Sequence, residues 1–177
     1  MIVERNRFNA TPGAGPRHAA WHPSLKILYI LYEMGSFVGS YTIDPATGAL
    51  TEIGRASTVF TGCNPVFSGY SKAAEIVVTA DGLHVIASNR GYGPDSGDVM
   101  VFVVEVDGTL NHPGNPSKVG DRFPRGMSLT GDDGRTLIVC GQEGSTLTKF
   151  TVNLDATLTQ NGEPVPAPSH PTTVVFA

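Results

Sequence analysis

A histidine and a glutamate occupy the same place in two similar segments of the sequence. His18 and Glu75 each lie six residues before a turn residue, which is Ser24 in one segment and Asp81 in the other. An imidazole titrates near neutral pH, and a carboxyl group with a raised pKa can do the same, so both side chains are able to move a proton in catalysis. We therefore select His18 and Glu75 as candidate catalytic residues.

Arginines stand close to the same places. Arg125 comes two residues before Met127, which takes the corresponding place in a third segment, and Arg90 ends the second strand of its own segment. Residues two apart on a strand share a face, so Arg125 can point the same way as Met127. A guanidinium binds a carboxylate or a phosphate through two parallel hydrogen bonds. Arg90, Arg125 and Arg17 are therefore candidate residues for binding an anionic substrate.

Each candidate also has a structural interpretation. Arg90 and Arg125 can form ion pairs with Glu75 or Asp121 and so tie neighbouring segments together. His18 can hydrogen-bond a backbone carbonyl. Glu75 leads into a strongly apolar strand, where a carboxylate needs a partner or a raised pKa. The residue types alone leave both roles open.

The segments that carry these residues form a threefold repeat. Their turns, at Ser24, Asp81 and Asp133, are 57 and then 52 residues apart. Nine residues after each turn residue comes a polar residue, in the order Glu33, Arg90 and Gln142. A period of roughly 40–50 residues with four strands in each unit is typical of β-propeller blades.

The strands that build each unit are visible as alternating patterns. Residues 99–104 and 146–152 alternate as half-buried strands do, and no segment has the 3.6-residue period of a helix. Asp-Gly and Thr-Gly pairs mark hairpin turns, where glycine adopts a positive φ. A β-sandwich would explain the strands but not the threefold register. We therefore predict an all-β fold, a partial β-propeller of about three four-stranded antiparallel blades.

The domain limits follow from the repeat. We expect a poorly defined N-terminal segment over 1–12, blades over about 13–58, 59–120 and 121–170, and one extra C-terminal strand over 171–177. Trp21 is expected in the core of the first blade. Propellers close with 4–8 blades, so we expect the chain to correspond to the C-terminal part of a larger propeller and to self-associate through its open blade edges.

Composition and charge exclude several classes of function. The net charge is −4, and no run of Lys or Arg offers a surface for nucleic acid or an anionic membrane. No apolar stretch suits a secretory signal or a membrane span. Cys63 and Cys140 form neither a disulfide framework nor a zinc site, and the histidines lack metal-ligand spacing. We expect a cytoplasmic protein that needs no cofactor and no metal.

Four stretches carry a family resemblance: GAGPRHAAWHP (13–23), AAEIVVTADG (73–82), ASNRG (87–91) and FPRGMSLT (123–130). In these stretches the chain resembles the lactonase seven-bladed β-propellers, which include cycloisomerase-type 6-phosphogluconolactonases and carboxy-cis,cis-muconate cyclases. The resemblance implies an enzyme that opens or closes the lactone ring of a small anionic substrate without a cofactor. It places His18, Glu75, Arg90 and Arg125 around the mouth of the propeller channel.

Two functions remain after this comparison. One is a lactonase or lactonising cycloisomerase that acts by acid–base chemistry on an acidic sugar lactone or on carboxymuconate. The other is a non-catalytic or degenerate propeller fragment that serves as a binding scaffold. Family membership alone does not fix a reaction, so the arrangement of the candidate residues has to separate the two.

Overall fold

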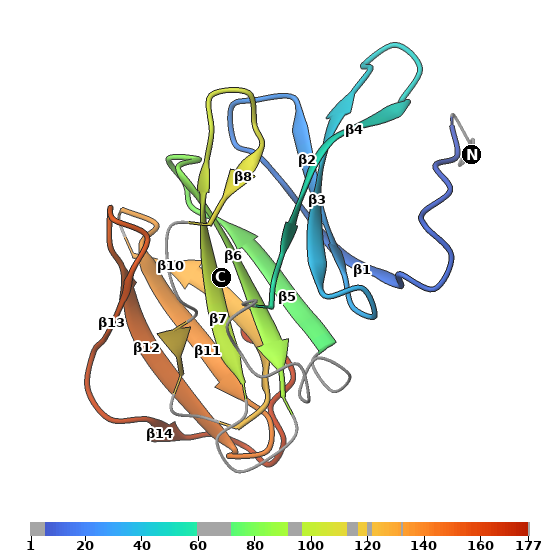
Figure 1. The fold of residues 1–177 in the computed structure, drawn as a ribbon. Helices are drawn as coiled ribbons and strands as arrows, with labels where there is room; N and C mark the ends of the chain where they lie inside the picture. Colours follow the sequence, from blue (N-terminus) through green and yellow to red (C-terminus); the bar gives the residue numbers. More distant parts are fainter. Residues whose placement is uncertain are drawn as a thin grey trace.

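A computed structural model of the protein describes residues 6–59, 72–91, 97–112, 117–119, 122–131 and 133–176. Over these residues the secondary structure consists of strands and turns, and the strands form three antiparallel sheets. Figure 1 shows the sheets fanned side by side in chain order, from blue through green to red. No described segment forms a helix, so none can cross a membrane as a long apolar helix. The expected all-β fold is confirmed.

The first sheet, blade 1, is a meander of four strands in the order β1-β2-β3-β4. Its strands are β1 (Pro16–Trp21), β2 (Ile27–Tyr32), β3 (Phe37–Ile43) and β4 (Leu50–Ser57).

The second sheet, blade 2, follows the order β5-β6-β7-β8, and the short strand β9 also pairs with β7. Its strands are β5 (Lys72–Val78), β6 (His84–Arg90), β7 (Asp98–Val104), β8 (Leu110–Asn111) and β9 (Ser117–Lys118). Two short strands thus take the outermost place that β4 fills alone in blade 1.

The third sheet, blade 3, repeats that plan in the order β10-β11-β12-β13, with β14 paired to β12. Its strands are β10 (Pro124–Thr130), β11 (Thr136–Gly141), β12 (Thr146–Val152), β13 (Leu158–Gln160) and β14 (Val165–Pro166). The turns predicted at Ser24, Asp81 and Asp133 each join the first strand of a blade to its second.

The first strands β1, β5 and β10 are neighbours in space, in chain order. Residues 171–176, where the sequence predicts a further strand, have no assigned strand structure. They nevertheless run beside β10, because a side-chain carbon on Gly126 would come within 2.7 Å of the Cα of Thr173. The C-terminal residues therefore continue the series of innermost segments.

Two apolar layers hold the blades together. One joins blades 1 and 2 around Tyr29, Leu31 and Phe102, and the other joins blades 2 and 3 around Ile86 and Phe150. Every residue of β6 is buried, and its successive side chains serve opposite layers because strand side chains alternate between the two faces. Blade 2 is thus packed on both sides, which fixes the positions of its neighbours.

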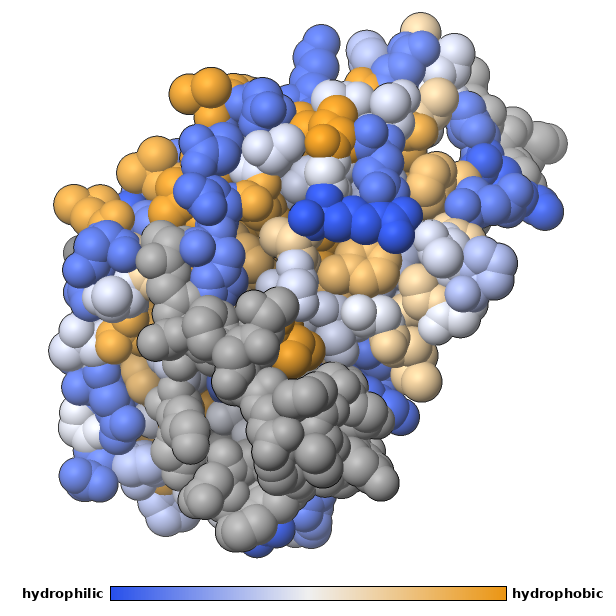
Figure 2. Space-filling view, in the orientation of Figure 1, coloured by the Kyte–Doolittle hydropathy of each residue, from blue (hydrophilic) through white to orange (hydrophobic). Residues whose placement is uncertain are grey.

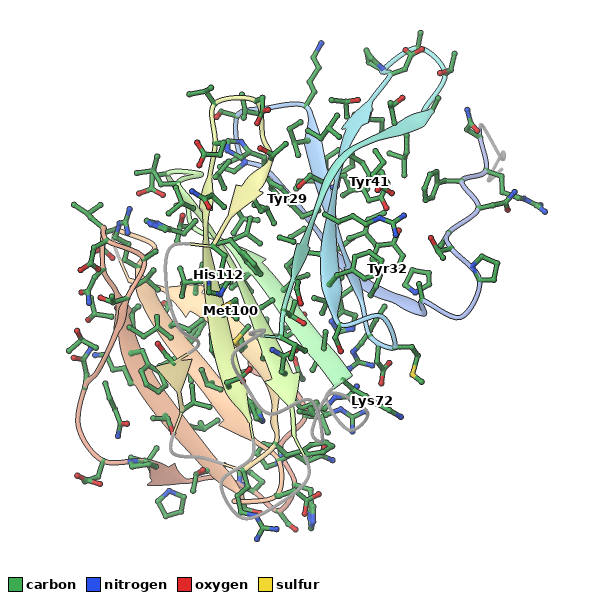
Figure 3. All side chains as sticks on the ribbon, viewed as in Figure 1. Tyr29, Tyr32, Tyr41, Lys72, Met100 and His112 are labelled. Atoms are coloured by element: carbon green, nitrogen blue, oxygen red, sulfur yellow. The ribbon has the colours of Figure 1, made fainter. Side chains whose placement is uncertain are left out.

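The outer face of blade 1 carries a smaller cluster. Tyr32 and Tyr41 are buried there and their hydroxyls are 2.7 Å apart (Figure 3), while Phe8 from the N-terminal segment packs edge-on against Tyr41. The prediction that Trp21 lies in the core is wrong, because Trp21 is 56% exposed. Trp21 is the last residue of β1, next to the hairpin tip, where no neighbouring strand covers it.

Exposed apolar residues also occur at other hairpin tips. Val106 lies in the β7–β8 turn and Leu154 in the β12–β13 turn, and both are exposed. In Figure 2 hydrophobic side chains reach the surface at these two tips, separated by hydrophilic ones. These tips lie at the opposite end of the strands from the candidate site residues described next.

Candidate functional site

All three innermost strands carry a β-bulge near their first residues. The register shifts between Pro16 and His18 in β1, between Ala73 and Ile76 in β5, and between Pro124 and Gly126 in β10. A bulge leaves a residue outside the regular ladder and turns its side chain in a new direction. The residues set apart in this way are Arg17, the Ala74–Glu75 pair and Arg125. Four of the five candidate site residues thus lie at or next to a bulge.

His18 and Glu75 meet across the junction of blades 1 and 2. His18 Nδ1 is 2.6 Å from Glu75 Oε1, and the two residues are 57 positions apart in the chain. An ionised carboxylate only accepts hydrogen bonds, so Nδ1 carries the proton and Nε2 is the free ring nitrogen. The side chain of His18 is 41% exposed and that of Glu75 is 16% exposed. The free nitrogen belongs to a ring that solvent can reach.

The backbone around Glu75 fixes its carboxylate. Glu75 Oε1 also accepts the amide of Ile76 at 3.1 Å, and the Glu75 amide donates to Ser88 Oγ at 3.1 Å. These bonds provide the partner that the sequence argument required for a carboxylate at this position. Glu75 is therefore held in place to orient the imidazole.

Arg17 reaches the same junction. Its Nε donates to the carbonyl of Ala74 at 2.8 Å, and its Nη1 lies 3.7 Å from Glu33 Oε2. Burial raises the pKa of Glu33, but the hydrogen bond and charge of Arg90, together with the charges of Arg17 and Lys72, outweigh it and hold this pKa below its ordinary value. Lys72 is the first residue of β5 (Figure 3). One carboxylate thus stands among three cations.

Arg90 is occupied by protein groups. Its Nη2 donates to Glu33 Oε1 and, at 3.4 Å, to the carbonyl of Ala73, while its guanidinium carbon lies 5.5 Å from the ring centre of Phe123. The side chain is 8% exposed. Of the ion-pair partners considered from the sequence, Glu75 is not the one used, and Asp121 lies outside the described residues. Arg90 ties blade 2 to blade 1.

Arg125 is held differently. Its Nη1 donates to Gln142 Oε1 at 3.1 Å, and the side chain is half-buried. Among the described residues no carboxylate pairs with it. Arg125 follows Phe123 by two residues, and the ring of Phe123 lies beside Arg90, so Arg125 belongs to the same end of the blades as His18. It presents a positive charge that no described group neutralises.

Three contributors were missed as site residues from the sequence: Glu33, Lys72 and Gln142. The nine-residue register did single out Glu33 and Gln142 as matching positions, but it does not say which neighbour a side chain reaches. Lys72 had no signal beyond its charge.

The described residues offer no cluster of three or more His, Cys, Asp or Glu side chains that could bind a metal. His22 bonds within its own turn and to the carbonyl of Gly82, at 3.1 Å, which gives it a structural role. Cys140 is buried with a free thiol, as expected for a strand residue. Cys63 is outside the described part of the chain.

The sequence matches a known family over nearly its whole length. The family model for "Lactonase, 7-bladed beta-propeller" covers residues 2–176. A 6-phosphogluconolactonase of Bacillus subtilis is 31% identical over 151 residues, which are 85% of this chain and 40% of that protein. A 6-phosphogluconolactonase of Pectobacterium atrosepticum is 30% identical over 86% of this chain and 43% of its own length. The chain spans about two fifths of the length of these relatives.

Solved structures show the same fold. A Lactobacillus plantarum protein superposes with a TM-score of 0.86 at 25% identity, over 98% of this chain and 48% of its own. A periplasmic gluconolactonase of Pseudomonas aeruginosa gives a TM-score of 0.79 at 22% identity, over 93% of this chain and 43% of its own. The three sheets therefore correspond to neighbouring blades of a propeller.

Proposed function

Because the chain belongs to the lactonase family of seven-bladed β-propellers, we propose that it carries the acid–base site of a lactonase that acts on an acidic sugar lactone of the 6-phosphogluconolactone type. The observation that carries the proposal is the 2.6 Å contact between His18 Nδ1 and Glu75 Oε1. It stands at the bulged ends of two inner strands and next to arginines. Relatives named 6-phosphogluconolactonase support the choice of substrate class.

In hydrolysis, His18 is the general base. Its Nε2 accepts a proton from a water molecule while the water oxygen bonds to the carbonyl carbon of the lactone. The ring C–O bond then breaks, and the ring oxygen takes the proton that His18 holds. One water is consumed and a hydroxy acid is formed. Glu75 keeps the proton on Nδ1 and stabilises the imidazolium that exists between the two transfers.

The arginines bind the acidic part of the substrate. Arg125 is available for a phosphate or carboxylate, because among the described residues its guanidinium donates to a neutral amide and pairs with no carboxylate. Arg90 is buried and donates to Glu33 and Ala73, so its contribution is to hold the site together. Arg17 is intermediate between Arg125 and Arg90, since its guanidinium lies 3.7 Å from the Glu33 carboxylate, beyond hydrogen-bond distance.

The same residues can serve ring closure of a carboxymuconate. There a substrate carboxylate oxygen bonds to a carbon of the conjugated system, and protonated His18 gives its proton to the neighbouring carbon and recovers one from solvent. No atoms leave the substrate. This substrate is the second arm of the assay below.

The test is a kinetic comparison of the protein with two variants, His18→Gln and Glu75→Gln. We expect kcat on 6-phosphoglucono-1,5-lactone to fall by about 10²–10⁴-fold for His18→Gln, as is usual when a general base is removed, with little change in KM. The effect of Glu75→Gln should be in the same direction and smaller, since this residue acts through the imidazole.

His170→Gln is the matched control, because His170 is exposed near the C-terminus. Binding without turnover of the sugar lactone or of carboxymuconate would favour the non-catalytic scaffold instead. Turnover that is indifferent to His18→Gln would refute the assigned roles.

A further inference from the structure

Blades 1 and 3 hold an arginine in the same backbone frame. The carbonyl of Gly15, a residue with φ of 65°, accepts the amide of Glu33 at 2.8 Å. The carbonyl of Phe123, with φ of 67°, accepts the amide of Gln142 at 3.1 Å. The bulged residue two positions after Gly15 is Arg17, and the bulged residue two positions after Phe123 is Arg125. The two arginines are therefore placed by equivalent main-chain geometry.

The side chain opposite the arginine differs between these frames. In blade 1 the guanidinium of Arg17 lies 3.7 Å from the carboxylate of Glu33. In blade 3 the guanidinium of Arg125 donates to the amide oxygen of Gln142 at 3.1 Å. A carboxylate both orients and neutralises an arginine, whereas an amide oxygen orients it and leaves its charge intact.

We propose that Gln142 is a specificity-determining residue, which holds Arg125 through a neutral amide so that its positive charge is available to the phosphate or carboxylate group of the substrate. This inference rests on the proposed function of the same site. It predicts that the choice between an anionic and an uncharged lactone depends on the charge at position 142. Gln142 does not touch the reacting atoms, so it acts as a positioning residue.

The first test measures binding by titration calorimetry with 6-phosphogluconate and with gluconate, which differ by one phosphate group. Gln142→Glu should weaken 6-phosphogluconate binding by about tenfold or more, since a hydrogen-bonded carboxylate then competes for Arg125. Gluconate affinity should change far less. Gln160→Glu, the same substitution on exposed strand β13, is the matched control and should leave both affinities unchanged.

The second test separates charge from shape. Gln142→Met keeps the side chain neutral and of similar length but removes the acceptor, so we expect a loss of 6-phosphogluconate affinity of about threefold, less than for Gln142→Glu. In turnover, Gln142→Glu should raise KM for 6-phosphoglucono-1,5-lactone and leave kcat, and KM for uncharged glucono-1,5-lactone, near the parent values.

The outcomes decide two questions separately. Equal weakening by Gln142→Glu and Gln142→Met, or equal loss for the charged and uncharged ligands, would overturn the inference, as would a parent protein that does not prefer 6-phosphogluconate. If the protein hydrolyses no lactone but its preference for 6-phosphogluconate is lost in Gln142→Glu, the proposed function fails and the charge selection by Gln142 stands.

Discussion

The two blade junctions of the molecule are built differently at the end that carries the candidate site. Between blades 1 and 2, hydrogen bonds and ion pairs join residues 57 positions apart: Arg17 with Ala74, His18 with Glu75, and Glu33 with Arg90. Between blades 2 and 3, the contacts at this end include the guanidinium of Arg90 over the ring of Phe123 and the close approach of Gly97 to Pro124. The ion pair of that junction, Arg135 with Asp81, lies at the opposite end, in the hairpin turns.

The difference separates two tasks. At the first junction Arg17 and Arg90 share the carboxylate of Glu33, and the surrounding bonds hold the His18–Glu75 pair in place. In blade 3, at the same end, Arg125 has no carboxylate partner among the described residues, which leaves room for a charge supplied by a ligand. Preorganised groups and one unsatisfied charge are what selective anion binding requires. The predictions below test this contrast, beginning with the largest expected effect.

Of these changes, removing the Glu33 carboxylate from the first junction should lower the free energy of unfolding the most. Glu33→Gln leaves the guanidinium of Arg90, whose side chain is 8% exposed, without its anion. Loss of one partner of a buried pair costs about 3–5 kcal/mol, and because Glu33 is one quarter exposed we expect about 2 kcal/mol of unfolding free energy. Chemical denaturation measures it.

Glu163→Gln, at an exposed glutamate, is the control for Glu33→Gln. Replacing both partners, as Glu33→Leu with Arg90→Met, should recover stability relative to Glu33→Gln, because the buried guanidinium of Arg90 is then no longer left without its anion. If Glu33→Gln were as stable as the parent protein, the first junction would not depend on its ion pairs.

The second junction should weaken first as the pH falls. Burial, and then the charge of Arg135, lower the pKa of His84 below its ordinary value of 6.5, against the opposing charges of Asp81 and Asp155. The unfolded chain therefore takes up this proton first, and stability declines as the pH drops below 6.5. Glu33 has a lowered carboxyl pKa, so its contribution is lost only below its ordinary value of 4.5.

The pH dependence of the unfolding free energy checks this order. His84→Gln should flatten the curve between pH 6.5 and pH 5 and should leave the loss below pH 4.5 in place. The loss assigned to His84 should be smaller than the effect of Glu33→Gln. An unchanged slope in His84→Gln would show that the second junction is not the more acid-sensitive one.

The ion pair of the second junction should be worth less than that of the first. Arg135 donates to Asp81, whose side chain is 35% exposed, and to the carbonyl of Val152 at 3.3 Å. Because water screens the carboxylate, we expect Arg135→Gln to cost about 1 kcal/mol and the cost to shrink in high salt. Lys149→Gln, at an exposed lysine of β12, is the control. A cost above that of Glu33→Gln would reverse the ranking of the junctions.

The smallest effect is expected at Phe123. Its positive φ costs about 1–2 kcal/mol for a residue with a side chain, and its ring against Arg90 returns about 0.5–1 kcal/mol. Phe123→Gly removes both, so the unfolding free energy should change by less than about 1 kcal/mol. Phe123→Ala loses the ring and keeps the strain, so it should be the less stable variant. The reverse order would mean that backbone strain at Phe123 is negligible.

The repeat made much of the fold predictable. Turn residues such as Asp81 and Asp133 fix where each blade turns back, and alternation marks the strands that follow. The bulges were not predictable, because Arg17 and Arg125 stand in stretches without a distinctive bulge signal. Trp21 was assigned to the core because it stands in a predicted strand, although its place at the end of that strand leaves it exposed.

For the candidate site, the register of the repeat predicted which positions are equivalent better than it predicted which side chains contact each other. It placed His18 and Glu75 at matching points of two blades, and neighbouring inner strands then bring them into contact. The same register identified Glu33 and Arg90 as equivalent positions. Their ion pair nevertheless joins one blade to the next, which depends on side-chain length and direction. Whether Arg125 carries a free or a compensated charge depends on Gln142, whose hydrogen bond no periodicity reveals.

The recurring separation of 57 residues also has a kinetic consequence. Each hairpin of a blade closes a short loop, whereas the three polar contacts named above for the first junction each require the ends of a 57-residue loop to meet. Loop closure on that scale is entropically slower than hairpin formation. In repeat architectures units form and then dock, so an intermediate with both hairpins complete would still lack the histidine–glutamate pair. Assembly of the site would thus report the docking of blades and not the formation of strands.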